Sequence, residues 1–426
     1  MPVRIHRAVA LLALAGCGAA PPGSDLPDGG ASPDLRLPPI GPVVVSATAR
    51  SSFEAESAIA VSPAGDVAIA WMADTPRTIL IGYAISHDGG ARFGAPVIIE
   101  PVAAGRTLAD PVLAVDGRGA FWLAWIDFDD SANEDLLVAT AAPGADRFGP
   151  PHPVAPRRRG ASYDKPWIGA LPDGRVLITY GYFGGNTSGV VAATSHDGVD
   201  WTHVTIARDP PNNAERNFAR VCAQPVGDRV FATFITTDAR NRVTEIGYVR
   251  SDDLAMSWLA PGVVAGADRG PLGNDDPACA ADDGLWVAYG LSRDLFDGHL
   301  NPALTALRVA RTADGMSFPL HAEVPIGAAL AMHPQIVVEE GGAIDVVFHA
   351  GAEDNDLLGS VVRARSTDGG ATFTTTTVQS KIALVRSRDG ADWIGDYFGA
   401  TWARGALHLA YADNGSGESH VVFRRE

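Results

Sequence analysis

Residues 59–71 read Ile-Ala-Val-Ser-Pro-Ala-Gly-Asp-Val-Ala-Ile-Ala-Trp, which is an apolar run, a turn with Gly and Asp, and a second apolar run that ends in an aromatic residue. The same pattern ends at six later aromatic residues, spaced 54 to 63 positions apart: Trp125, Tyr180, Phe234, Tyr289, Phe348 and Tyr411. Because self-similarity at a regular spacing is typical of repeat architectures, we interpret most of the chain as seven copies of one unit.

Each unit has the pattern of a small β-sheet. Period-two alternation, many Val and Thr, and turn residues at short intervals favour strands over helices. Four strands in about 55 residues are typical of one blade of a β-propeller. We therefore predict an all-β fold, a β-propeller of four-stranded blades over residues 41–426, with seven blades and six as the alternative. The last unit lacks a strand, so we expect the run Val43-Val44-Val45 to complete it and close the ring.

The N-terminal segment has the features of an export signal. Arg4 and Arg7 precede a short apolar stretch, residues 8–14. The following Leu14-Ala15-Gly16-Cys17 resembles the lipobox of bacterial lipoproteins, which implies a signal peptide over residues 1–16 and lipidation of Cys17. An ordinary secretory signal is the alternative. Residues 17–40 are rich in Pro, Gly and Asp, so we expect a disordered tether.

The net charge and the N-terminal export signal together predict the partners and the localisation of the protein. The chain has 33 Lys and Arg against 50 Asp and Glu, a formal net charge of −17, which argues against nucleic acid as a partner. We expect membrane contact through the N-terminal lipid only, in the cell envelope, at the outer membrane or surface of a Gram-negative bacterium. We also expect a monomer.

A turn motif recurs between the third and fourth expected strands. Ser86-His-Asp88-Gly-Gly-Ala-Arg-Phe93 returns as Ser366-Thr-Asp368-Gly-Gly-Ala-Thr-Phe373. Altered copies surround three further aspartates: Asp197, Asp253 and Asp314. These turns resemble the Asp-box, or bacterial neuraminidase repeat, of sialidase-like propellers, and the resemblance covers nearly all of residues 41–426. Asp can accept backbone N–H bonds, Gly permits positive φ and the aromatic residue packs back, so we assign these aspartates a structural role.

Ionisable residues also recur at one position of the repeat. Near the start of each expected innermost strand lies at least one ionisable residue, and the set is Glu56, Asp110, Asp164, Lys165, Glu215, Arg216, Asp275, Asp276, His333 and Asp396. Propellers carry function on loops near their axis, so we predict that these groups converge on a central funnel opposite the turn motifs. The alternative is that each aspartate only caps backbone N–H groups of its loop.

The sialidase resemblance implies a particular reaction, in which three arginines bind the sugar carboxylate, a Glu activates a Tyr nucleophile, and an Asp is the acid/base. Carried onto this chain, the nucleophile is Tyr397, its partner is Glu215, and the acid is Asp110 or Asp164. The carboxylate-binding arginines would include Arg216 and Arg220, and the other ring residues would bind ligand: Glu56, Lys165, Asp275, Asp276, His333 and Asp396.

The sequence therefore predicts a surface protein that binds and hydrolyses a glycan, a divergent exo-α-sialidase-like glycoside hydrolase. The first unit lacks an Arg-Ile-Pro type motif, and sialidases have six units where we count seven. These departures support the alternative, a non-catalytic adhesion module that binds a protein or polysaccharide.

Two further predictions concern metal and sulfur. Asp127, Asp129 and Asp135 place oxygens at alternate positions of one loop, a pattern that suits Ca²⁺, although a plain acidic loop is the alternative. Cys222 and Cys279 fall in the innermost strands of adjacent units, so in an exported chain they form either one disulfide or two buried thiols.

Overall fold

A computed structural model describes residues 37–46, 53–129, 134–155, 160–184, 188–211, 214–273, 275–292, 304–351, 358–383, 395–413 and 419–426. They belong to one compact unit, Arg36–Glu426. The signal peptide, Cys17 and most of the tether lie outside the described residues, so the domain boundaries and the lipid remain predictions. No helix of a length and hydropathy suited to crossing a bilayer occurs among the residues that the structure describes.

The first three sheets each contain four consecutive strands. Their bounds are β2 (Phe53–Val61), β3 (Val67–Asp74), β4 (Ile79–Ser86) and β5 (Val97–Ile99); β6 (Thr107–Val115), β7 (Phe121–Phe128), β8 (Glu134–Ala141) and β9 (His152–Ala155); β10 (Ser162–Ala170), β11 (Val176–Phe183), β12 (Gly189–Ser195) and β13 (Thr202–Arg208).

The remaining sheets follow the same order. They comprise β14 (Glu215–Ala223), β15 (Val230–Thr237), β16 (Val243–Ser251) and β17 (Gly262–Gly266), then the short 3₁₀ helix η2 (Ala267–Arg269); β18 (Ala278–Ala281), β19 (Leu285–Ser292), β20 (Leu304–Thr312) and β21 (Leu320–Val324); β22 (Leu330–Val338), β23 (Ile344–Gly351), β24 (Leu358–Ser366) and β25 (Thr374–Ala383); and β26 (Gly399–Ala403), β27 (Ala406–Asp413), β28 (His420–Arg425) and β1 (Ile40–Val44).

Within each four-stranded unit, neighbouring strands pair antiparallel, which confirms the predicted all-β fold of four-stranded units. The pairing of Leu304 with Ala331 joins β20 to β22, so strands β18 to β25 form one eight-stranded sheet. For that reason the count of seven blades remains a prediction. The N-terminal strand β1 pairs with the C-terminal strand β28, in register at Val43 with Phe423.

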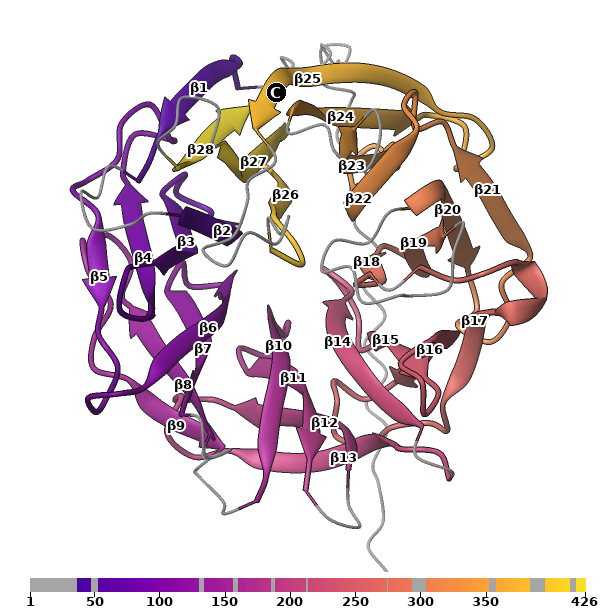
Figure 1. The fold of residues 1–426 in the computed structure, drawn as a ribbon, viewed down its shortest axis with the longest axis horizontal. Helices are drawn as coiled ribbons and strands as arrows, with labels where there is room; N and C mark the ends of the chain where they lie inside the picture. The colour runs from indigo at the N-terminus through magenta and orange to yellow at the C-terminus, as the bar shows by residue number, and fades with distance from the viewer. Residues whose placement is uncertain are drawn as a thin grey trace, which may run out of the picture. The chain divides into compact units, whose positions relative to one another are not determined.

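Within this unit the strands that lie nearest the centre are β2, β6, β10, β14, β18, β22 and β26 (Figure 1). Each of these innermost strands contacts the next along the chain, from β2 through β6, β10, β14, β18 and β22 to β26, and β26 contacts β2. The arrangement brings residues from distant parts of the sequence to one axis. The early residues of every innermost strand therefore lie around this axis.

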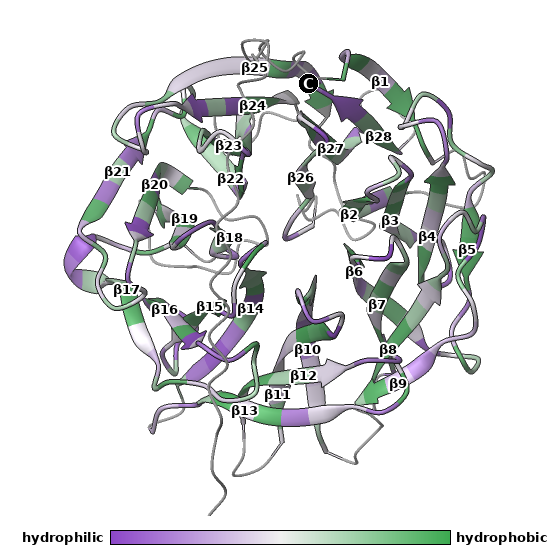
Figure 2. Ribbon diagram, turned by 180° about the vertical axis from the view of Figure 1, so that it is seen from behind, coloured by the Kyte–Doolittle hydropathy of each residue, from purple (hydrophilic) through white to green (hydrophobic). Residues whose placement is uncertain are grey.

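The repeated aromatic residues explain why the units stack. Trp71, Trp125 and Tyr289, at corresponding positions of β3, β7 and β19, are each at most 1% exposed. Large rings that fill the space between neighbouring sheets bury much apolar surface, which no sheet could do alone. Figure 2 accordingly shows hydrophobic stretches along strands such as β4 and β7 and hydrophilic stretches on the outer strand β21.

The motif turns are closed by side-chain hydrogen bonds. Ser86 Oγ donates to Asp88 at 2.9 Å, the backbone N–H of Gly90 donates to Ser86 Oγ at 2.9 Å, and the ring of Phe93 packs against Phe423, 5.4 Å between centroids. Gly90 has φ +90°, a left-handed conformation in which its missing Cβ makes room for Phe423. Equivalent hydroxyl-to-carboxylate bonds join Ser195 to Asp197, Ser251 to Asp253, Thr312 to Asp314 and Ser366 to Asp368. Such contacts are those of a structural staple.

Candidate functional site

The innermost strands share a distortion at the position of their ionisable residues. In β2, β6, β10, β14 and β22 the pairing register shifts around one residue with a left-handed backbone. These residues are Glu56 (φ 47°), Asp110 (φ 54°), Lys165 (φ 46°), Phe218 (φ 55°) and His333 (φ 53°). Left-handed conformations are costly for residues other than glycine, and bulges re-aim side chains beside functional sites. A distortion that recurs in five strands marks the axis as the candidate site.

Lys165 lies at the centre of this site. Its Nζ is 3.2 Å from Glu56 Oε1 and 2.8 Å from Asp110 Oδ1, and it forms a third ion pair with Asp396. The four residues come from β2, β6, β10 and the segment before β26. The side chains of Glu56 and Asp110 are 0% and 7% exposed, whereas those of Lys165 and Asp396 are 12% and 23% exposed. Of these four side chains, those of Lys165 and Asp396 are therefore the ones most accessible to solvent.

Charge compensation governs the protonation of this group. Burial raises the pKa of Glu56 well above its ordinary value, and Lys165 only partly opposes that shift. Burial alone would lower the pKa of Lys165, but Asp110, Asp396 and Glu56 outweigh it, so the pKa of Lys165 is raised well above its ordinary value. Lys165 is therefore a permanent cation here, and the carboxyls around it share its charge.

Asp164 adds a titratable carboxyl next to Lys165. It is half-buried and accepts a hydrogen bond from Asn217 Nδ2 at 2.6 Å. Burial, and after it the charge of Asp110, raises the pKa of Asp164 to about 7. A carboxyl with a pKa near neutrality can hold a proton and release it at physiological pH, which is the property of a general acid.

A second ion pair completes the site. Arg220 Nη2 lies 2.9 Å from Asp276 Oδ2, and Arg220 Nη1 donates to Gln335 Oε1 at 2.7 Å. The guanidinium carbon of Arg220 stands 4.0 Å from the ring centroid of Trp167. We define the axial cluster as the carboxyls and cations of this region: Glu56, Asp110, Asp164, Lys165, Arg220, Asp275, Asp276 and Asp396.

Two buried histidines border the axial cluster. The backbone N–H of His333 donates to Asp275 Oδ2 at 2.8 Å, and the Nδ1 atoms of His333 and His349 are 3.4 Å apart. Burial lowers the pKa of His333 to about 4, and burial together with His333 lowers the pKa of His349. Both rings are therefore neutral near pH 7 and add no positive charge to the site.

Tyr397 and Glu215 do not form the predicted nucleophile pair. The hydroxyl of Tyr397 is buried and donates to the carbonyl of Pro111 at 2.9 Å. Burial, and after it Glu56 and Asp110, raise the pKa of Tyr397 well above its ordinary value. Glu215 is exposed at the start of β14. A buried hydroxyl bound to a carbonyl, with no Glu215 beside it, is poorly prepared to become a nucleophile.

The predicted arginine group is also incomplete. Arg216 donates to the carbonyl of Arg208 at 2.9 Å, and its guanidinium is 3.8 Å from Glu245. Of the two arginines that the sequence suggested, only Arg220 belongs to the axial cluster. The reason is a three-residue misalignment of this unit, because Phe218, not Glu215, holds the distorted position of β14.

A simple count along the chain finds the distorted position. Glu56, Asp110, Lys165 and His333 each lie 15 residues before the aromatic residue that ends their repeat, and so does Asp396. In β14 the count falls on Ala219, one residue beyond Phe218. Because the sequence analysis selected residues by their charge, it did not find the neutral members of the site: Asn217, Phe218, Trp167, Gln335 and His349.

The predicted calcium loop needs correction. The guanidinium of Arg106 forms a short ion pair with Asp127 and lies 3.4 Å from Asp129 and 2.9 Å from Asp135. Arg106, whose side chain is 3% exposed, thus supplies the positive charge that a metal was expected to supply. Across the described part of the chain, no group of three or more His, Cys, Asp or Glu side chains is placed to hold a metal ion.

Cys222 and Cys279 form a disulfide, with their Cα atoms 6.1 Å apart. The bond joins β14 to β18. Cys222 lies two residues after Arg220, and Cys279 lies three residues after Asp276. It therefore ties together the two segments that carry the second ion pair of the axial cluster.

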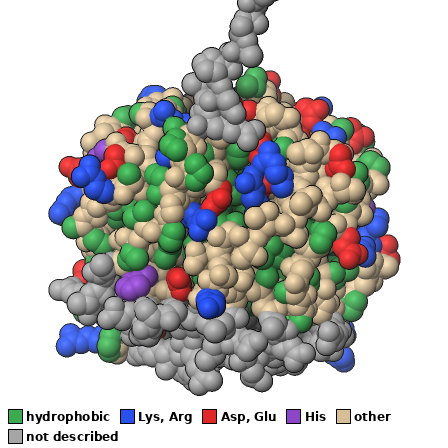
Figure 3. All heavy atoms as spheres, turned by 90° about the horizontal axis from the view of Figure 1, so that it is seen from above, with side chains coloured by type: hydrophobic (Ala, Val, Ile, Leu, Met, Phe, Trp, Pro, Cys, Tyr) green, Lys and Arg blue, Asp and Glu red, His purple; other side chains and the backbone are tan. Residues whose placement is uncertain are grey.

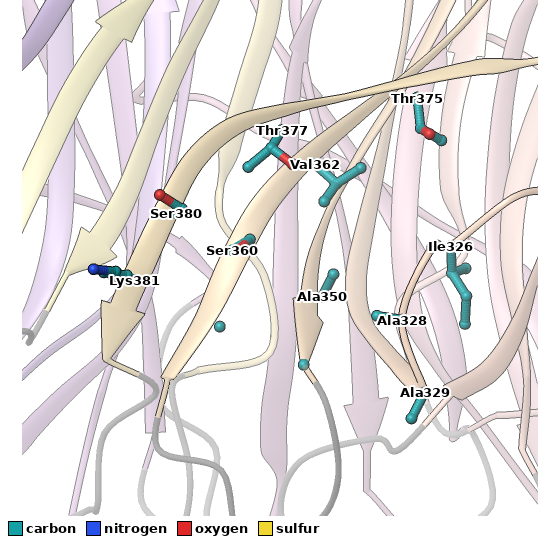
Figure 4. Close-up of a pocket in the computed structure, with 13 residues that line it drawn as sticks. Ile326, Ala328, Ala329, Ala350, Ser360, Val362, Thr375, Thr377, Ser380 and Lys381 are labelled. Atoms are coloured by element: carbon teal, nitrogen blue, oxygen red, sulfur yellow. The ribbon is translucent and has the colours of Figure 1, made fainter.

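A separate hollow of about 610 Å³ lies away from the axial cluster, beside β24 and β25 (Figure 4). Hydroxyl side chains such as Ser360 and Thr377 line it together with small apolar residues, and Lys381 is the only ionisable residue of its lining. It therefore has no pair of acid and base groups. On the face seen in Figure 3, positive and negative side chains are interspersed, without a large patch of one sign.

Comparison with known proteins extends this description at the level of the fold. No protein-family model matches the sequence, and no curated protein matches it. Among solved structures, the Hadza microbial sialidase Hz136 is 13% identical with a TM-score of 0.50, over 88% of this chain and 66% of that one. A Penicillium chrysogenum α-L-arabinanase complexed with arabinobiose is 12% identical with a TM-score of 0.50, over 92% and 98%.

A polysaccharide lyase of family PL25, an ulvan lyase bound to -[GlcA(1-4)Rha3S]-, is 11% identical with a TM-score of 0.59, over 90% of this chain and 95% of that one. Identities this low show the fold alone. The all-β architecture of this chain is thus a propeller-like fold that it shares with these three solved structures.

Proposed function

We propose that the protein is a glycoside hydrolase that works through carboxyl groups at the axis, with Asp164 as the proton donor. One observation carries the proposal: Asp164 has a pKa of about 7 and remains half-buried within the axial cluster. Cleavage of a glycosidic bond needs a carboxylic acid that protonates the leaving oxygen and a second carboxylate on the other side of the sugar.

Asp396 is the best candidate for the second carboxylate. It is the other partly exposed acid of the cluster, and it forms an ion pair with Lys165. Two carboxyls whose surroundings push them toward opposite protonation states can divide the roles of acid and base. The fold shared with a sialidase and an arabinanase supports this reaction class.

The proposal departs from the sialidase reaction that the turn motifs imply. Tyr397 is bound to Pro111 and Glu215 is exposed, so neither residue is assigned a catalytic role. The structure supports the general class of glycan hydrolysis better than that particular mechanism.

The experiment is substitution of Asp164 by Asn in the full chain, tested on aryl glycosides and on polysaccharides by release of reducing ends. We expect at least a 100-fold loss of kcat with glycan affinity changed less than threefold, because general acid catalysis contributes about 10²–10⁴ in rate. Asp200→Asn, an exposed residue of the turn after β12, is the matched control. Unchanged kcat in Asp164→Asn would refute the assignment.

The second candidate is a non-catalytic module that holds a glycan or protein at the cell surface. The internal pairing of Lys165 and Arg220 with carboxylates favours it, because such pairs also occur in purely structural networks. It predicts glycan binding without turnover in the wild-type protein and in Asp164→Asn alike.

We also propose that Cys17 carries a lipid that anchors the protein in the cell envelope of a Gram-negative bacterium. The lipobox-like Leu14-Ala15-Gly16-Cys17 supports this. Metabolic labelling with an alkyne fatty acid should mark the wild-type chain and leave Cys17→Ser unlabelled. Equal labelling of both would exclude this site.

A further inference from the structure

The charges of the axial cluster bear on the sugar that it accepts. Six carboxyl groups face two cations: Glu56, Asp110, Asp164, Asp275, Asp276 and Asp396 against Lys165 and Arg220. Even with some carboxyls protonated, the cluster offers no surplus of positive charge. An anionic sugar would therefore find no surplus positive charge to bind it in this poorly solvated site.

Both cations are already engaged. The ammonium of Lys165 contacts three carboxylates. Arg220 donates from Nε and Nη2 to Asp276 and from Nη1 to Gln335, and its guanidinium plane lies over the ring of Trp167. Recognition of a sugar carboxylate or sulfate requires a guanidinium fork that can bind two oxygens, and neither cation is free to supply it.

Two unpartnered oxygens of the site accept hydrogen bonds, whereas the unpartnered Nε2 atoms of His333 and His349 belong to neutral rings in which a ring nitrogen can also donate. Asn217 Oδ1 and Asp276 Oδ1 are buried and have no hydrogen-bond partner among the described residues. Both oxygens accept hydrogen bonds, Asp276 as its carboxylate. Asn217 Oδ1 packs against Gly181. A sugar hydroxyl can donate to Asp276 Oδ1, whereas an ionised carboxylate or sulfate cannot. A buried acceptor that stays unsatisfied is costly, so this preference helps to select between ligand classes.

Two aromatic rings accompany these acceptors. Phe218 lies 5.7 Å from Lys165 Nζ, and both Phe218 and Trp167 are partly exposed. Apolar ring faces beside a few polar groups are the usual lining of a site for an uncharged ligand.

We infer that the glycan bound at the axial cluster is uncharged, built from neutral pentose or hexose units and free of carboxylate and sulfate. The inference rests on the proposed function and names its substrate class. It excludes sialic acid, and it separates this protein from the lyase bound to a uronate- and sulfate-bearing glycan.

Binding of the full chain to two series of polysaccharides at 0.15 M NaCl tests the inference. Arabinan, xylan and galactan form the neutral series, and polygalacturonate and ulvan the acidic series. We expect at least one neutral polymer to bind at least tenfold more tightly than either acidic polymer, with an affinity that changes less than twofold between 0.05 and 0.5 M NaCl. Tighter binding of an acidic polymer, or binding of neither series, would overturn the inference.

Turnover separates this inference from the proposed function. Neutral polymers that bind but are not cleaved would defeat the hydrolase and leave the substrate class standing, whereas cleavage of a sialoside would do the opposite. As a site-specific check, Asp276→Asn should weaken neutral glycan binding about fivefold to tenfold, with the unfolding midpoint recorded alongside. The salt dependence of the wild-type protein remains decisive if that variant is unstable.

Discussion

The ammonium of Lys165 lies 2.8 Å from the carboxylate of Asp110, although these residues belong to the innermost strands of different sheets. The same ammonium also contacts Glu56 and Asp396, so one side chain links four segments of the chain at the axis.

Substitution of Lys165 by Met should strongly destabilise the fold. It leaves buried carboxylates uncompensated, and removal of one partner from a buried ion pair costs about 3–5 kcal/mol. The free energy of unfolding from urea titrations at pH 7 measures the effect. Lys381, the other lysine of the chain, is exposed, and Lys381→Met should change stability by no more than about 0.5 kcal/mol. Equal effects of the two substitutions would show that the axial ion pairs contribute little.

Removal of the disulfide should lower stability through the unfolded state. Cys222 and Cys279 are 57 positions apart, a loop whose closure is worth about 4 kcal/mol in the chain-entropy description. We expect Cys222→Ala/Cys279→Ala to unfold at clearly lower urea concentration than the wild type. A reducing agent should shift the wild type toward the variant and leave the variant unchanged.

A thiol count checks the bond itself. In Cys17→Ser, the denatured chain should react with no thiol reagent before reduction and with two equivalents after it, since the chain contains three cysteines. Two reactive thiols before reduction would contradict the disulfide.

The activity should fall as pH rises through about 7. Asp164 must be protonated to act as the acid, and its pKa is about 7. The profile of kcat against pH measures this alkaline decline in activity. The decline should be absent from the residual activity of Asp164→Asn. A decline that persists unchanged in the variant would assign the titration to another group.

The same pKa has a consequence for stability. Because the folded pKa of Asp164 is above the unfolded value, ionisation disfavours the folded state, and the cost grows from about pH 4 to pH 7. Asp164→Asn should therefore be more stable than the wild type at pH 8, by an amount that vanishes below pH 4. Loss of stability at pH 8 would instead mean that the carboxylate holds the cluster together.

His87 should contribute a small pH-dependent stabilisation. Its Nδ1 is 3.1 Å from Asp66 and its Nε2 is 3.0 Å from Asp146, and the hydrogen bond to Asp66 is the main cause that raises the pKa of His87. The contribution is fully present below the unfolded pKa and is lost as pH rises through the folded pKa. Since His87 is more than a third exposed, we expect less than about 1 kcal/mol.

His87→Gln measured by urea unfolding tests this. The variant should be less stable than the wild type at pH 5.5 and indistinguishable from it at pH 9. A difference of the same size at both pH values would point to packing rather than charge.

The sequence was informative where the repeat was regular. The apolar periodicity and the recurring aromatics predicted the strands, and the regular entry of Glu56 and Asp110 into the innermost strands pointed to the axis. It failed in the unit of β14, where the ionisable Glu215 was predicted at the axis although Phe218 holds that position, because charge was a stronger signal than register. It also missed that Arg106 reaches back to Asp127, since nothing local indicates a contact between residues on separate segments.

By itself, the sequence determined the class of the fold, because apolar alternation and turn residues act locally and repeat in every unit. Only the tertiary structure decided which side chains meet. Lys165 acquires three carboxylate partners, and Tyr397 finds the carbonyl of Pro111, through contacts between residues far apart in the chain. The pKa of Asp164 depends on the burial and neighbouring charge that these contacts create, and no local pattern encodes either of them.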